Sequence, residues 1–386
     1  MLLRRPALAA VVALALGMVL GPLGLHLLRP QLVDDGAPIE SLSEISLLIC
    51  LFCAGLRLRL PLAWHHWRMP LRLSTLTMGA TAAMAAAVAH LMFDMSFAES
   101  LLLGVIVAPT DSVLASDVAP HSDSEHDGLA FVLGAEGGLN NGLATTLVLV
   151  VLALMGLSDS DSLSLGPISL IALWAVCGGF MVGWLTGTGA ARCITLLDPE
   201  RRTDFLEETL VFAAAALAYG AALLLHTDGF LAVFAAGVAL SHGGRLRRLP
   251  RNRPLMPRVL RISARIERFA WLAVIVLLGA LVASVDFRGR MLVFALLLLL
   301  LVRPLAVRLG LGGMAVAENQ WRGIAWFTPR GVASLYCLAL AIDHGLSSLF
   351  ARELAGITLV VMVSSIIASG ISGLPLSRAS PDTVDL

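Results

Sequence analysis

Long apolar segments repeat along the whole chain and restrict its possible folds more than any other feature. Each is about 17 to 25 residues long, the length that an α-helix needs to cross a hydrocarbon core of about 30 Å. Backbone groups inside a bilayer must be hydrogen-bonded within the protein, so such segments must be helical. We expect twelve spans, near 6–28, 42–60, 72–94, 97–118, 129–156, 166–191, 205–226, 228–243, 267–285, 289–309, 322–344 and 354–377. The sequence therefore predicts an all-α polytopic membrane protein.

Composition supports this class and excludes others. Of the 386 residues, 58% are hydrophobic and only 14% are charged, which is outside the range of soluble globular domains. The net charge is zero, so nothing favours nucleic acid as a partner. No phosphate loop, nucleophile elbow or zinc-protease motif indicates an enzyme or a cofactor. Cys50 and Cys53 form a C-x-x-C inside an apolar run, which favours packing over redox chemistry or zinc binding.

Ionisable and amide side chains nevertheless interrupt the stretch from Gly104 to Leu149. Asp111, Asp117 and Glu136 lie there, together with Asn140 and Asn141. An ionised side chain in a membrane costs several kcal/mol and usually marks a transport pathway. We therefore predict an ion pathway that is lined by Thr110, Asp111, Asp117, Asn140 and Asn141.

Two spans carry a proline near their middle, Pro109 in APTDS and Pro329 in FTPRG. Proline removes a backbone donor and breaks a helix, and the freed polar groups are tolerated only inside the protein or beside a cavity. Paired broken spans in comparable positions are typical of inverted-repeat transporters. Asp111 follows the first proline and Arg330 the second, and a purely structural role for both is to neutralise the ends of the broken helices.

Arginines indicate the orientation of the chain. They occur in the connections after the second, sixth, eighth and tenth spans and are missing after the third, fifth and seventh. By the positive-inside rule both termini should be cytoplasmic, although the acidic HSDSEHDG connection falls on the same side. The connection 243–268 is strongly basic and could touch anionic lipid headgroups. We expect one transmembrane domain over 1–386, with a short tail at 378–386.

Seven motifs in order resemble those of monovalent cation:proton antiporters, in the NhaP-like branch related to the animal sodium–proton exchangers. They are LFCAGLRL at 51–58, APTDSVLASDV at 108–118, GAEGGLNNGLA at 134–144, DGFLAVFAAGVAL at 228–240, IERFAWLAVIVLLGALV at 266–282, LLVRPLAV at 300–307 and WFTPRGVASLY at 326–336. The resemblance implies an inverted-repeat bundle with two crossed broken helices, usually a homodimer, in the bacterial inner membrane. Relatives carry one more helix before the Gly-Pro-Leu-Gly segment, and its absence would also make the N-terminus cytoplasmic.

The resemblance also implies a mechanism in which one embedded carboxylate binds either a sodium or potassium ion or a proton. The cation would bind near Asp111, Asn140 and Asn141. In relatives the carboxylate belongs to an Asn-Asp pair, but here the pair reads Asn140-Asn141, and an amide cannot take up a proton in this range. Two further departures are Gly137, where relatives commonly have a hydroxyl, and Ser112, where proline is usual.

Supporting ion pairs carry over intact from the family. The resemblance places Glu136 opposite Arg303 and Asp111 near Arg330. These four charges cancel, whereas an aspartate at position 141 would leave one net negative charge to attract a cation. Other embedded acids could replace the missing carrier, Asp117 first among them. The remaining acids are Glu44, Glu207, Glu208, Asp228, Glu267 and Asp343, and His226 and His242 could sense pH.

Three functions remain open at this stage. The first is sodium or potassium/proton antiport, altered by the replacement at Asn141. A second is a transport-impaired paralogue with a structural or regulatory role in the membrane. The third is a passive cation conductance, since a neutral amide pair can solvate a cation without coupling it to protons.

Overall fold

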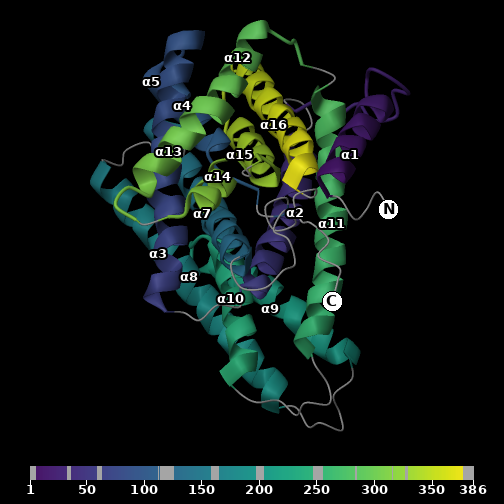
Figure 1. Ribbon diagram of the computed structural model, residues 1–386, viewed down its shortest axis with the longest axis vertical. Helices are drawn as coiled ribbons and strands as arrows, with labels where there is room; N and C mark the ends of the chain where they lie inside the picture. Colours follow the sequence, from purple (N-terminus) through teal and green to yellow (C-terminus); the bar gives the residue numbers. More distant parts are fainter. Residues whose placement is uncertain are drawn as a thin grey trace, which may run out of the picture.

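The computed structural model is a bundle of helices (Figure 1). It describes residues 6–32, 36–58, 63–111, 113, 126–157, 165–196, 204–246, 255–282, 285–314, 316–326 and 329–376. Within these ranges every regular element is helical, as the apolar segments predict. The helices are α1 (Pro6–Leu20), α2 (Gly36–Arg57), α3 (Trp64–Arg72), η2 (Leu73–Thr77), α4 (Met78–Phe93), α5 (Phe97–Val107), α7 (His126–Leu154), α8 (Leu165–Leu196), α9 (Asp204–Leu224), α10 (Gly229–Leu246), α11 (Leu255–Val282), α12 (Gly289–Leu297), η3 (Leu298–Val302), α13 (Arg303–Gly310), α14 (Glu318–Trp326), α15 (Val332–Asp343) and α16 (Ser348–Leu376).

Each of the twelve expected spans overlaps a helix or a run of adjoining helices, although α1 ends at Leu20, before the expected end of the first span, and part of the fourth span lies outside the described residues. Seven of the described helical runs are long and apolar enough to cross a membrane, and α1, α5, α10 and α15 are shorter apolar helices. Both proline-containing spans are interrupted as predicted. Helix α5 ends at Val107, two residues before Pro109, and α15 begins at Val332, three residues after Pro329.

A π-helical turn interrupts each helix that precedes a broken span. The turn η2 joins α3 to α4 ahead of α5, and η3 joins α12 to α13 ahead of α14 and α15. Single π-turns inside α-helices are rare and often lie at functional sites. Their matching positions in the two halves of the chain agree with an inverted repeat.

Helix α10 packs against α2, α7, α8 and α9. Glycines permit the closest of these approaches. A Cβ built on Gly55 would lie 2.4 Å from the carbonyl oxygen of Phe234, and one on Gly237 would lie 2.6 Å from that of Phe52. Helices α2 and α10 therefore touch backbone to backbone, a mode of packing that small residues allow in membranes.

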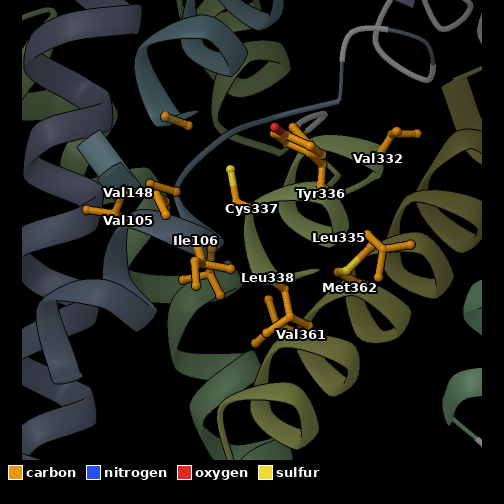
Figure 2. Packing of buried hydrophobic residues seen from close by; sticks show 14 of the residues in the cluster. Val105, Ile106, Val148, Val332, Leu335, Tyr336, Cys337, Leu338, Val361 and Met362 are labelled. Atoms are coloured by element: carbon orange, nitrogen blue, oxygen red, sulfur yellow. The ribbon is translucent and has the colours of Figure 1, made fainter. Parts of the chain in front are cut away.

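Apolar side chains fill the space around the two broken spans (Figure 2). Val105 and Ile106 of α5 lie close to Val148 of α7 and to Leu338 of α15. Helix α16 covers α15 from the other side. The half-helices α5 and α15 are thus held by packing close to their breaks.

The basic connection before α11 also differs from the sequence prediction. The basic connection predicted at 243–268 is helical at both ends, because α10 continues to Leu246 and α11 begins at Leu255. The cause is a stripe of buried residues on α11 at spacings of four, Val259, Ser263 and Glu267. Glu267 forms an ion pair with Arg57, and the Cys53 thiol lies 3.5 Å from the Ser263 carbonyl oxygen. Contacts with α2 therefore extend α11 beyond its apolar segment.

Candidate functional site

The two breaks meet and are joined by a hydrogen bond. The backbone N–H of Asp111 donates to the carbonyl oxygen of Pro329 across 2.8 Å. We call this junction, formed by residues 108–111 and 329–331, the crossing. Backbone polar groups freed by the two prolines are therefore satisfied between the breaks, which is what the interior of a membrane protein requires.

The charged residues at the crossing lie beside helix ends of the opposite polarity. Arg330 is fully buried, and its Nε donates to the carbonyl oxygen of Val107, 2.9 Å away, at the C-terminus of α5. Asp111 lies beside the N-terminus of α15, where a Cβ on Gly331 would fall 1.8 Å from its Oδ2. An arginine at a negative helix end and a carboxylate at a positive one are both stabilising. This geometry matches the structural role considered for the two residues.

A tryptophan that the sequence analysis did not single out also binds Asp111. The indole Nε1–H of Trp271, on α11, donates to Asp111 Oδ2 across 2.9 Å, and the other oxygen accepts the N–H of Val113 at 2.8 Å. Trp271 is only 2% exposed. A buried indole N–H usually finds an acceptor. A lone tryptophan in an apolar span next to an embedded acid was therefore the sequence signal that could have pointed to this contact.

Beside the crossing, α7 contributes a second set of polar side chains. Glu136 and Arg303 are both buried, and their Oε1 and Nη2 atoms are 2.5 Å apart. The Asn140 Nδ2 lies 3.5 Å from the same Glu136 oxygen and 3.4 Å from Thr110 Oγ1. Asn140 thus connects the ion pair to the first break, and four of the predicted site residues lie together.

Asn141 is buried on α7 with 3% exposure, and its backbone carbonyl accepts the Thr145 hydroxyl at 3.2 Å. Its side-chain Oδ1 has no hydrogen-bond partner within the described residues. Gly137 is buried one turn earlier on the same helix. The replaced Asn-Asp position is therefore in the protein interior, next to the crossing, without a titratable group of its own.

The other candidates are scattered. Asp117 and Ser112 lie outside the described residues. Glu267 is paired with Arg57, and the carboxylate of Glu44 accepts a hydrogen bond from the Tyr219 hydroxyl. The remaining positions vary in burial: Glu207 and Asp228 are buried, Glu208 and His242 are half-buried, and Asp343 and His226 are exposed.

Two broken helices that meet around buried acids and arginines define an inverted-repeat secondary transporter. The comparison with protein families agrees. The family model described as "Sodium/hydrogen exchanger, transmembrane" matches residues 4–379, so the chain belongs to this family. The predicted family is confirmed, and it is a family of transporters rather than enzymes.

Among characterised relatives, the chain is similar to the K(+)/H(+) antiporter NhaP2 of Shewanella sp. strain MR-4, with 24% identity over 351 residues. That alignment covers 88% of this chain and 58% of the relative. A probable Na(+)/H(+) antiporter of Schizosaccharomyces pombe is 27% identical over 244 residues, which are 60% of this chain and 31% of that one. The chain thus spans little more than half the length of the NhaP2 relatives.

Solved structures confirm the fold. The sodium proton antiporter MjNhaP1 from Methanocaldococcus jannaschii, determined at pH 8, superposes with a TM-score of 0.76 at 20% sequence identity. The match covers 95% of this chain and 92% of that one. The chain therefore has the inverted-repeat antiporter fold that its broken spans predicted.

Proposed function

We propose that this protein exchanges a monovalent cation, sodium or potassium, for protons across the bacterial plasma membrane. The observation that carries the proposal is the crossing: the Asp111 N–H bonds to Pro329, with Glu136, Asn140 and Arg303 buried beside it. Two acids and two arginines cancel in charge, so coupling of the cation to a proton requires a further carboxylate that can take up the proton. Membership of the exchanger family and the names of the relatives support the same activity.

In this proposal the polar oxygens near the crossing receive the cation. Thr110, Asn140 and Asn141 offer neutral oxygens, and Asp111 offers a carboxylate held by Trp271. The cation would shed its water onto these groups while one half of the bundle moves against the other. We further propose that the protein is a homodimer with both termini in the cytoplasm, as the arginine distribution indicates.

Asn141 favours a second candidate, an antiporter relative with impaired transport. Exchange requires that loading the cation and loading the proton exclude each other, and an amide at this position cannot be protonated. Coupled exchange would then be lost unless another acid binds the proton. A passive cation leak would be the remaining activity of such a site.

Exchange in everted membrane vesicles tests the proposal. The full chain is expressed in a host that lacks its own antiporters, a pH gradient is formed, and dequenching of a ΔpH dye is followed after addition of sodium or potassium chloride. Cation-dependent dequenching above that of vector vesicles is expected between pH 6.5 and 8.5. Its absence at matched expression would reject antiport in favour of the impaired relative.

Purified chain in liposomes separates antiport from a leak. An antiporter acidifies or alkalinises the lumen when a cation gradient is imposed with no membrane potential. A leak would instead let the cation pass down its electrochemical gradient and would leave the luminal pH unchanged while no membrane potential is present.

A further inference from the structure

A buried carboxylate with no assigned role lies where α10 begins. Asp228 is 7% exposed, and both of its oxygens are engaged. Oδ1 accepts the N–H of Leu231 at 2.7 Å, and Oδ2 accepts the hydroxyl of Thr146, on α7, at 2.8 Å. Its own N–H donates to the carbonyl oxygen of Ala175, on α8, at 3.0 Å. The carboxylate is thus fixed between three helices.

The charge of Asp228 is not cancelled. Glu136 and Glu267 are each paired with an arginine, but in the part of the chain that the structure describes no basic side chain forms an ion pair with Asp228. Its donors, the Thr146 hydroxyl and the backbone N–H groups of Leu231 and Phe230, are neutral. Burial disfavours an ionised carboxylate and hydrogen-bond donors favour it. A group under both influences can exist in either protonation state.

Groups that face Asp228 from the neighbouring helices are acidic or phenolic. On α9 the ring of Tyr219 lies against Gly229, where an added Cβ would be 2.6 Å from the ring, and its hydroxyl donates to the half-buried Glu44 of α2. On α15 the ring of Tyr336 lies 4.8 Å from that of Phe230. The next residue of α15, Cys337, is also buried (Figure 2). From α7 and α8, Asp228 bonds the Thr146 hydroxyl and a backbone carbonyl oxygen.

Thr146, which bonds Asp228, lies on the same helix as Asn141, the residue that replaces the expected aspartate. Asn141 and Thr146 are five residues apart, about 7.5 Å along the helix axis. Helices α7 and α10 run side by side here, since a Cβ on Gly142 would touch Leu231 and one on Gly138 would touch Phe234. His226, two residues before Asp228, is exposed, so this end of α10 is close to the surface.

We infer that Asp228 binds the transported proton in place of the missing carboxylate at position 141. The inference rests on the proposed antiport. A proton entering from the non-cytoplasmic side adds to the Asp228 carboxylate and gives a neutral acid, still bonded to Thr146. When a monovalent cation enters the site, the same proton leaves to water, and the ionised carboxylate balances the cation.

Substitution of Asp228 by asparagine tests this inference in the vesicle assay. Asp228→Asn keeps one oxygen that accepts the Leu231 N–H, and its amide NH2 can donate to the Thr146 hydroxyl oxygen, but it cannot ionise. We expect the initial rate of cation-dependent dequenching to fall at least tenfold at every pH, with unchanged expression and thermal stability in detergent. Asp94→Asn is the matched control, because Asp94 is exposed after α4 in a left-handed conformation that asparagine accepts, and its rate should stay within twofold of native.

A double variant separates loss of the carrier from loss of structure. Adding Asn141→Asp to Asp228→Asn supplies a carboxylate at the family position and should restore at least half of the native rate. Native exchange that persists in Asp228→Asn would overturn the inference and leave the proposed antiport intact. Loss of exchange in both variants would overturn it too, because Asp228 would then be structural. Absence of exchange in the native chain would reject the proposed function itself, and the inference with it.

Discussion

Truncation of the buried ion pair between α7 and α13 should be among the most damaging single changes in this protein. Glu136 and Arg303 have side chains that are 0% and 1% exposed, and their charged atoms are 2.5 Å apart. Removing one partner leaves the other charge buried and uncompensated, which costs about 3–5 kcal/mol. At about 1.36 kcal/mol per factor of ten, the unfolding equilibrium should shift by roughly two to four orders of magnitude.

Arg303→Ala and Glu136→Ala each test this magnitude. Unfolding of purified protein in mixed detergent micelles, followed by circular dichroism, gives the free energy of unfolding of each variant. Glu136→Ala should lower the free energy of unfolding at least as much as Arg303→Ala does, because Asn140 also loses an acceptor at 3.5 Å. The combined Glu136→Gln and Arg303→Met variant removes both charges and should be less destabilised than the sum of the two alanine variants.

An exposed ion pair provides the control. Glu318 and Arg322 are one helical turn apart on α14, with side chains that are 76% and 63% exposed. Arg322→Ala should change the free energy of unfolding by less than about 1 kcal/mol. If Arg303→Ala were as stable as Arg322→Ala, the reasoning that Glu136 and Arg303 hold each other in a dry interior would be wrong.

Three further outcomes are expected. Asn141→Asp alone adds one negative charge to a set that is now neutral and should raise cation-dependent exchange in vesicles, and an unchanged rate would contradict the position assigned to this residue. Trp271→Phe removes the N–H that bonds Asp111 at 2.9 Å, and it should lower the free energy of unfolding by about 1.5–3 kcal/mol in the same experiment. The same substitution should destabilise an Asp111→Asn background by less. Gly55→Leu should prevent folding into a monodisperse protein on size-exclusion chromatography, since even a Cβ would lie 2.4 Å from a backbone oxygen of α10, whereas Gly79→Ala, with nothing within 4 Å, should be neutral.

Much of the fold could be predicted from the sequence because its determinants are local. Span length is set by the number of consecutive apolar residues, and a proline breaks a helix wherever it removes an interior donor. The all-helical class and both interruptions were therefore predicted correctly, and each expected span overlaps a described helix. The start of α11 was not, because its basic residues hide a buried stripe at Val259, Ser263 and Glu267 that only contact with α2 stabilises.

The sequence by itself determined the class of protein, the family, and the fact that position 141 carries no titratable group. Only the tertiary structure decided which polar groups meet. Trp271 and Asp111 are 160 residues apart, and Asp228 and Thr146 are 82 apart. No local rule relates positions so distant, because their contact follows from how helices cross, and that depends on close packing at residues such as Gly55 and Gly237. A charge in a membrane interior must find its partner through that packing, and so the partners of Asp111 and Asp228 could be identified only in the folded bundle.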